Sequence, residues 1–228
     1  MNRPDAFTRS GAAAFLALLL CVGGASNAQT LAVSVEEEPA RGEGIRTFTP
    51  VFEQIVSFVH PVEFRLVFED VAGSDYTQQH APQGETAHDW SQLITLSGHK
   101  GIATRQPLTP GAFAQQIATG IQRSCPQTFA ARPLGNLRIS GHDAFIALVG
   151  CGTVASGVPR SETLLLVTIK GAADFFSIQW AERAAAVTQP PVLDEEKWRA
   201  RFRRLGPIWI CDKVPGESPP FVSCVEPG

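Results

Sequence analysis

Two long apolar stretches joined by a very short connection place the tightest constraint on the fold of this chain. Ser161–Lys170 contains the continuous apolar run Leu164–Val167, and Asp174–Arg183 alternates apolar and polar residues. Only Gly171, Ala172 and Ala173 separate them, and a link this short makes the two strands antiparallel neighbours in the expected sheet. The continuous run predicts a strand that is buried on both faces and therefore central in its sheet.

Further segments have the same strand character. Phe64–Val71 and Asp75–Ala81 flank a turn around Gly73 and predict a hairpin. Trp90–Ser97 alternates apolar and polar residues and predicts a third strand. Ile139–Cys151 contains an apolar run and predicts a second central strand.

Two segments change to a helical period. Thr109–Cys125 starts with a capping threonine and a proline at the first helical position, and its apolar residues recur every four positions. A second helix is expected from Asp194 to Leu205, because acidic residues at its start and arginines at its end complement the helix dipole. Gly206 ends this helix, and Pro207–Cys211 predicts one last short strand.

The order of hairpin, strand, helix, three strands and helix predicts an α+β domain with an antiparallel sheet of about six strands and helices packed on it. This order resembles the Mog1/PsbP-like α/β/α sandwich. The segment Tyr76–Leu96 resembles a pattern in uncharacterised proteobacterial proteins that carry signal peptides. The resemblance implies binding or accessory work in an assembly, and it carries over no catalytic residue.

The N-terminal end has the composition of a secretory signal peptide. Arg3 and Arg9 precede the apolar stretch Ala12–Val22, and the small residues Ser26 and Ala28 predict cleavage after Ala28. The stretch is too short to span a bilayer comfortably, so we expect no membrane span in the mature chain. The expected location is the periplasm or the exterior of the cell.

Cys21 leaves lipidation open as an alternative, because a cysteine at the end of an apolar run can carry acyl chains. Leu19 and Leu20 stand where lipoprotein processing uses small residues, which argues against it.

The expected organisation has four parts. Residues 1–28 are the signal peptide, and residues 29–47 form a flexible acidic leader, because they are charged and lack apolar periodicity. Residues 48–213 form a single globular α+β domain, and residues 214–228 form a Pro-rich tail that a disulfide pins.

Four cysteines remain after residue 28: Cys125, Cys151, Cys211 and Cys224. An even number in an oxidising compartment predicts two disulfides. Three pairings are possible, and we favour Cys125–Cys151 with Cys211–Cys224 because each pair is close in sequence. The spacing of Cys and His does not match a zinc finger, and we expect neither a metal nor a cofactor.

Charge and motifs narrow the function classes. The formal net charge is −3, which does not suggest a nucleic-acid binder. Gly-x-Ser-x-Gly, the phosphate-binding Gly-x-x-x-x-Gly-Lys, Gly-x-Gly-x-x-Gly and His-Glu-x-x-His are all absent from the sequence. Their absence lowers the case for an enzyme without excluding one, since a catalytic triad is defined in space.

The densest polar cluster comprises His80, Glu85, His88, Asp89 and His99. If the fold gathered them, imidazole nitrogens and carboxylate oxygens could bind a divalent metal or form acid–base pairs. The alternative interpretation is an exposed loop whose polar side chains satisfy turn hydrogen bonds.

Two other polar groups have simpler interpretations. His142 and Asp143 are adjacent at the start of a strand, so their side chains should point to opposite faces and not act as a pair. The second helix carries basic residues all around except on its apolar stripe, which is typical of a solvated helix and not of a docking surface. These residues are Lys197, Arg199, Arg201, Arg203 and Arg204.

Three functions follow as hypotheses. The leading one is an exported, non-catalytic binding or accessory protein whose partner is a protein or a small molecule of the envelope. The second is a small metal-dependent or acid–base hydrolase that uses the His80–His99 region. The third is a structural component of the cell envelope.

Overall fold

The computed structural model describes residues 35–37, 44–105, 107–154 and 158–225. The predicted signal peptide, its cleavage site at Ala28 and the lipidation candidate Cys21 lie outside these ranges. None of the helices in the described part is long and apolar enough to cross a membrane.

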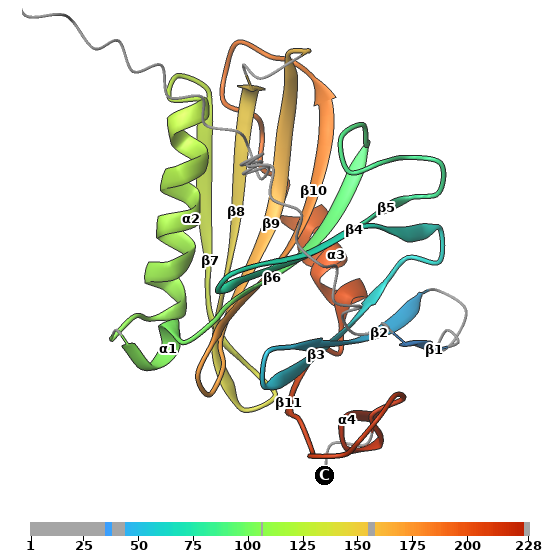
Figure 1. Cartoon of the computed structure of the whole chain (residues 1–228). Helices are drawn as coiled ribbons and strands as arrows, with labels where there is room; N and C mark the ends of the chain where they lie inside the picture. The colour runs from blue at the N-terminus through green and yellow to red at the C-terminus, as the bar shows by residue number, and fades with distance from the viewer. Residues whose placement is uncertain (1–34, 38–43, 106, 155–157, 226–228) are drawn as a thin grey trace, which may run out of the picture.

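A seven-stranded sheet in which every neighbouring pair is antiparallel forms the body of the protein (Figure 1). The strand order is β4-β5-β6-β10-β9-β8-β7. The bounds are β4 Phe64–Ala72, β5 Asp75–Pro82, β6 Gln92–His99, β7 Phe129–Ile139, β8 His142–Val154, β9 Arg160–Lys170 and β10 Phe175–Ala185. The predicted hairpin, the third strand and the three later strands are all confirmed.

The two strands expected at the centre are buried on both faces. Leu148 of β8 faces Leu165 of β9, and neither side chain is exposed. The next pair, Val149 and Leu164, points to the opposite face and is also buried. Continuous apolar runs therefore correctly indicated strands covered on both sides.

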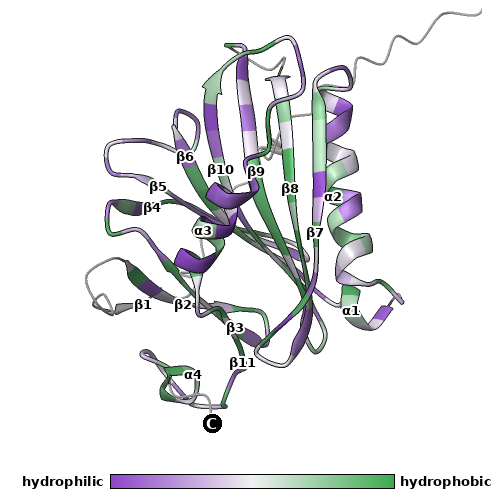
Figure 2. Cartoon of the chain, turned by 180° about the vertical axis from the view of Figure 1, so that it is seen from behind, coloured by the Kyte–Doolittle hydropathy of each residue, from purple (hydrophilic) through white to green (hydrophobic). Residues whose placement is uncertain are grey.

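Helices and a smaller sheet supply these covers. α2 (Pro110–Ser124) packs on one face, where its apolar side chains meet β8 and β9. α3 (Glu195–Leu205) packs on the other, where Trp198 and Leu205 join the main core. Thr109 caps α2 through its side-chain oxygen, as the sequence predicts, and Asp194, which the sequence predicts only as an acidic residue at the start of the helix, caps α3 in the same way. Figure 2 shows that α3 is largely hydrophilic on the side away from the sheets.

A second antiparallel sheet lies beside α3 (Figure 1), and of its strands the sequence predicts only the last, at Pro207–Cys211. Its order is β1-β2-β3-β11, with β1 Val35–Glu37, β2 Ile45–Val51, β3 Gln54–His60 and β11 Trp209–Asp212. Its inner side chains, including Val56 and Phe58, enter the core of the large sheet. The architecture is thus an α+β sandwich with two sheets rather than one sheet of about six strands.

The strands that the sequence did not predict, β2, β3 and β7, are not marked by the residues that usually bound a strand. The β2–β3 turn contains Phe52 with a φ of 56°, a conformation that favours glycine. A phenylalanine in the sequence does not predict a turn of this kind. β7 contains Pro133 and Gly135, which resemble loop residues. Both are tolerated there because β7 is an outer strand whose register shifts at that point.

Ordered structure begins before the expected domain start at residue 48. β2 starts at Ile45, and the leader residues Val35–Glu37 pair with it. The short helices α1 (Ile102–Arg105) and α4 (Val222–Val225) complete the elements.

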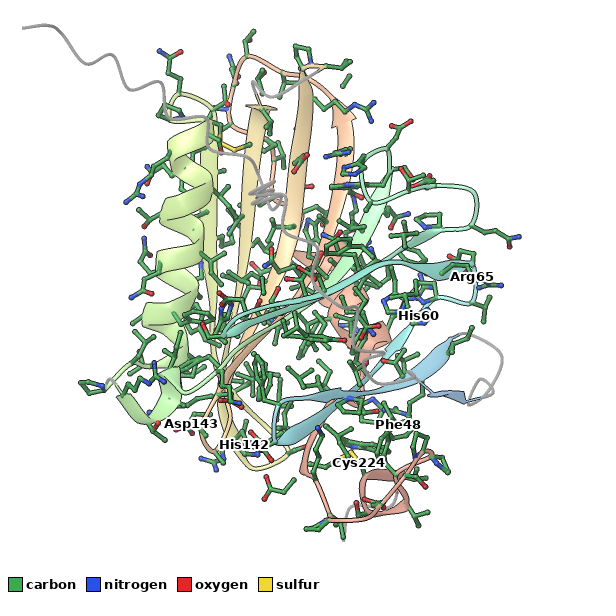
Figure 3. The ribbon with its side chains drawn as sticks, in the orientation of Figure 1. Phe48, His60, Arg65, His142, Asp143 and Cys224 are labelled. Atoms are coloured by element: carbon green, nitrogen blue, oxygen red, sulfur yellow. A yellow bond between two sulfur atoms is a disulfide. The ribbon has the colours of Figure 1, made fainter. Side chains whose placement is uncertain are left out.

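Both favoured disulfides are present. Cys125–Cys151 fastens the end of α2 to β8, with Cα atoms 5.8 Å apart. Cys211–Cys224 fastens β11 to α4, with Cα atoms 5.6 Å apart. Cys224 lies in a small cluster with Phe48 on the outer side of the second sheet (Figure 3).

Candidate functional site

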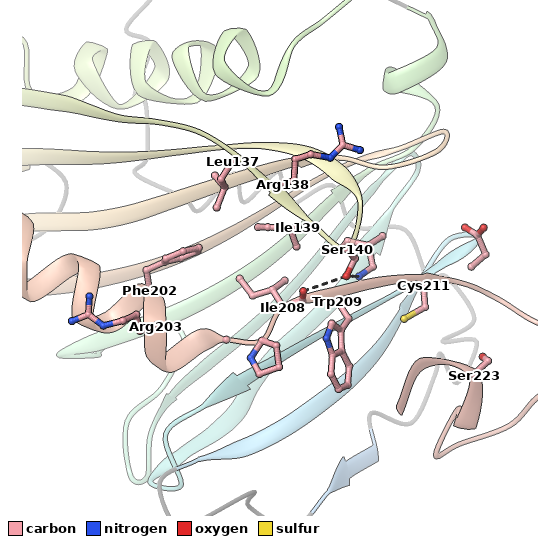
Figure 4. Close-up of a pocket in the computed structure, with 14 residues that line it drawn as sticks. Leu137, Arg138, Ile139, Ser140, Phe202, Arg203, Ile208, Trp209, Cys211 and Ser223 are labelled. Atoms are coloured by element: carbon pink, nitrogen blue, oxygen red, sulfur yellow. Dashed lines mark hydrogen bonds between the residues drawn. The ribbon is translucent and has the colours of Figure 1, made fainter. Parts of the chain in front are cut away.

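A groove of about 750 Å³ lies where the end of the large sheet meets the second sheet (Figure 4). One wall is the end of β7 with the turn that follows it, and the other is the connection from α3 into β11. β7 is an outer strand of the large sheet and β11 an outer strand of the second, so strand edges of both sheets line the groove.

Ser140 ties the two walls together. Ser140 and Gly141 form the two-residue turn between β7 and β8, and both have positive φ values, 48° and 77°, as tight hairpin turns require. This turn brings the Ser140 hydroxyl against β11, where it donates to the carbonyl of Ile208 at 3.4 Å and accepts from the backbone N–H of Ile210 at 3.2 Å. The groove therefore has a fixed width at this point.

The side chains of the groove are mainly apolar. Leu137 and Ile139 come from the β7 wall and Phe202 and Ile208 from the opposite one, and all four belong to or pack against the main core. Figure 4 shows Leu137 and Ile139 directed toward Phe202 and Ile208. Such a surface recognises a partner by shape and by apolar contact.

Three charged residues, Arg138, Arg203 and Asp212, line the groove, and two of them bond to neighbours within the chain. Asp212 is the one carboxylate among the described residues that line it, and its Oδ1 accepts from Gln54 Nε2 at 2.9 Å. The Arg138 guanidinium pairs with Asp143 at 2.8 Å and also donates to the Gly141 carbonyl. Asp212 and Arg138 thus each have a partner within the chain.

A second, smaller pocket of about 430 Å³ lies beside the loop between β5 and β6. The Arg183 guanidinium lies 3.6 Å from the centre of the Trp90 ring and bonds to Glu162 at 2.8 Å. Burial raises the pKa of Glu162, while the charge and hydrogen bond of Arg183 act in the opposite direction. The polar groups of this pocket thus satisfy one another.

Glu85, His88 and Asp89 of the predicted polar cluster lie together in that loop. The Glu85 carboxylate accepts from the N–H and the hydroxyl of Ser91, both at 2.6 Å. Thr86 Oγ1 accepts from the backbone N–H groups of His88 and Asp89. These contacts are turn hydrogen bonds within one exposed loop.

His80 and His99 lie elsewhere. His80 is buried between the two sheets beside His60, and burial followed by the charge of His60 lowers the pKa of His80 to about 3. His99 ends β6, where its Nδ1 lies 2.7 Å from Asp75 Oδ1. Within the described ranges, no group of three or more His, Cys, Asp or Glu side chains is placed to hold a metal ion.

The remaining polar candidates are separated as well. Figure 3 shows His142 and Asp143 near the β7–β8 turn, far from His60. On α3, Arg201 is not solvated as the sequence suggests: its guanidinium lies over the rings of Trp180 and Trp198 and pairs with Glu182 at 2.8 Å. Lys197 pairs with the same carboxylate, but its side chain stays 40% exposed.

The sequence did not predict the groove, because its two walls are more than sixty positions apart in the chain. The only local sign is the apolar sequence Ile208–Ile210 directly after the stop signal Gly206–Pro207, where a solvated linker would be polar.

Two solved structures are among the distant matches of this chain. No protein-family model and no curated protein matches the chain. The chain is similar to the Ran-binding protein Mog1p of Saccharomyces cerevisiae, with 13% identity, a TM-score of 0.38, and coverage of 76% of this chain and 85% of that one. It is also similar to LpqN of Mycobacterium tuberculosis, described as involved in cell envelope biogenesis, with 13% identity, a TM-score of 0.34, and coverage of 78% and 91%.

The α+β class is confirmed by the sheets and helices themselves. With TM-scores below 0.5, neither likeness assigns a function to this chain.

Proposed function

We propose that this chain is an exported, non-catalytic binding protein that holds a partner in the groove between β7 and β11. The observation that carries the proposal is the composition of this groove: apolar walls and strand edges, with Asp212 and Arg138 already bonded to neighbours. A site of this kind provides contact surface but no group that is free to transfer protons.

Export is supported by two independent features of the chain. The first 28 residues have the charge and apolar pattern of a signal peptide. The four later cysteines form two local disulfides, which persist in oxidising compartments and are rare in the cytosol. The predicted mature chain starts at Gln29.

The hydrolase alternative would need the His80–His99 region to act as one site. His80 lies between the sheets and His99 at the far end of β6, while the loop carboxylate Glu85 is engaged with Ser91. This distribution favours the binding proposal.

The test places a photo-crosslinking amino acid in the groove at position Leu137 in cells that make the protein. Val192, which is 91% exposed and does not line the groove, is the matched control position. We expect a discrete crosslinked partner from position 137 and none from position 192. The exported product should begin at Gln29 and contain two disulfides by intact mass.

Two results would overturn the proposal. Equal crosslinking from both positions would show that the groove is not the binding surface. Recovery of the reduced chain in the cytoplasm with residues 1–28 attached would remove the export argument.

A further inference from the structure

We infer that the groove binds a small amphiphile, a molecule with an apolar chain and one anionic head group, and that Arg203 holds the head group. This inference rests on the proposed function, because it names the class of ligand for the same groove. The groove volume of about 750 Å³ lies within the range of roughly 300–1,000 Å³ that is usual for small-molecule sites. Three features favour such a ligand: the apolar walls, the cation at one end and the closed edge of β11.

Apolar side chains from both walls leave part of their surface open to the groove. Leu137 and Phe202 pack against the main core and yet are only half-buried. An alkyl chain that covers them removes apolar area from water on the protein and on the ligand, which stabilises the complex. The walls therefore predict an apolar body for the ligand.

Arg203 is the charged residue of the groove that has no partner in the described part of the chain. Its side chain is exposed, and no ion pair or hydrogen bond joins its guanidinium to another described residue. It directly follows Phe202 in α3, so the cation stands next to an apolar wall. A guanidinium binds a carboxylate or a phosphate through two parallel hydrogen bonds. The charge of Arg203 therefore predicts an anionic head group.

The cation and the carboxylate of the groove stand at opposite ends. Asp212 is the one carboxylate among the described lining residues, and it ends β11, where it is bonded to Gln54. Figure 4 shows Arg203 at one end of the groove and Cys211, the neighbour of Asp212, at the other. A ligand with its head group at Arg203 thus keeps its negative charge away from Asp212. The groove therefore fixes the direction in which an amphiphile lies.

The closed edge of β11 disfavours a polypeptide ligand. The Ser140 hydroxyl occupies both the Ile208 carbonyl and the Ile210 N–H. A peptide that adds to a sheet as a further strand needs backbone groups of this kind for its own hydrogen bonds. An alkyl chain makes no hydrogen bonds, so side chains alone are sufficient to bind it.

The binding test uses the mature chain with both disulfides intact, at neutral pH, and isothermal titration calorimetry. Three probes share one alkyl chain and differ in the head group: decanoate is anionic, decanol is neutral and decyltrimethylammonium is cationic. We expect decanoate to bind, decanol to bind about tenfold more weakly, and the cation to bind more weakly still. Hexanoate and octanoate test the apolar walls, because each added methylene group should tighten binding by up to about fourfold.

The matched protein variants are Arg203→Gln and Arg204→Gln. Both remove one positive charge from the last turn of α3, but Arg204 does not line the groove. We expect Arg203→Gln to weaken decanoate binding about tenfold and to leave decanol binding within about threefold. Arg204→Gln should leave both within about threefold. Arg203→Lys, which keeps the charge and loses the forked geometry, should recover part of the affinity.

Several results would overturn the inference. They are equal binding of decanoate and decanol, affinity that does not rise with chain length, or equal effects of the two glutamine variants in proteins with unchanged melting temperatures. Binding to phosphatidylglycerol vesicles without binding of free decanoate would assign Arg203 to a membrane surface instead. Tighter binding of a peptide that alternates leucine with aspartate would assign the groove to an acidic polypeptide. If position 137 crosslinks a partner in cells while decanoate does not bind, the proposed function stands and only the ligand class fails.

Discussion

The imidazole rings of His60 and His80 lie face to face between the two sheets, with their centroids 4.6 Å apart and their planes at 30°. His60 is the last residue of β3 and His80 belongs to β5, so the pair joins the second sheet to the large one. Both side chains are buried, and Phe58 meets the His80 ring edge-on. Protonation of His80 would therefore place a charge between the sheets, away from water.

Stability should therefore fall as the solution becomes acidic. The pKa of His80 is about 3 in the folded protein against an ordinary value of 6.5, so below pH 6.5 the unfolded chain binds a proton that the folded chain excludes. The contribution of neutral His80 is complete above pH 6.5 and is lost toward pH 3, by up to about 1.4 kcal/mol per pH unit. Urea unfolding at a series of pH values measures this slope.

The variant His80→Leu should have a flatter slope than the unchanged protein. His88→Leu is the matched control, because His88 is exposed in the loop before β6. A pH slope that survives in His80→Leu would contradict the assignment.

Gly98 of β6 allows the second sheet to approach the large one. A Cβ atom on Gly98 would lie 2.4 Å from Val51 Cγ1 and 3.3 Å from Phe52. Gly98→Ala should lower the free energy of unfolding by about 2 kcal/mol, because overfilling a packed contact forces the sheets apart. Gly120→Ala is the control: nothing lies within 4 Å of its Cβ position on α2, and helix propensity predicts a gain of up to about 1 kcal/mol. Thermal melts of the two variants give the comparison.

The two disulfides should have similar effects on stability and different effects on binding. Replacing either pair with serine should lower the free energy of unfolding by about 3 kcal/mol. Only the Cys211–Cys224 replacement should weaken crosslinking from position 137, because this bridge holds β11 whereas Cys125–Cys151 joins α2 to β8. Denaturation curves and crosslinking yields, measured where both variants are folded, distinguish the two effects. Equal loss of crosslinking would show that the bridges act only through global stability.

Removal of Arg183 from its ion pair with Glu162 should lower the free energy of unfolding strongly. The Glu162 side chain is only 6% exposed, so Arg183→Ala leaves a buried carboxylate and should cost about 3 kcal/mol. Arg138→Ala breaks a pair whose side chains are both 67% exposed and should cost less than about 1 kcal/mol. Chemical denaturation measures both, and the double variant Arg183→Met with Glu162→Gln should recover part of the loss.

The sequence was informative where a single segment determines its own structure. The Thr109 cap and four-residue repeat located α2, and the apolar runs of β8 and β9 located the centre of the sheet. The sequence predicted the last strand of the second sheet but not its earlier strands, because a phenylalanine occupies the left-handed turn position between β2 and β3. The pairing of β11 with β3 joins distant parts of the chain, and no local pattern indicates it.

The groove depends on tertiary structure to a still greater degree. No local pattern pairs Ser140 with Ile208 and Ile210, about seventy positions later in the chain, and that contact fixes the groove width. His80 shows the converse, since its place in a polar run suggested a loop site while its position on a strand buries it.

The pairing of β11 with β3 also determines when the groove can form as the chain folds. β3 and β11 pair although about 150 positions separate them in the chain, so the second sheet closes only after β11 has been synthesised. A nascent chain that lacks β11 has the strands of the large sheet but lacks one wall of the groove. The groove is therefore among the last parts of the described fold that can form.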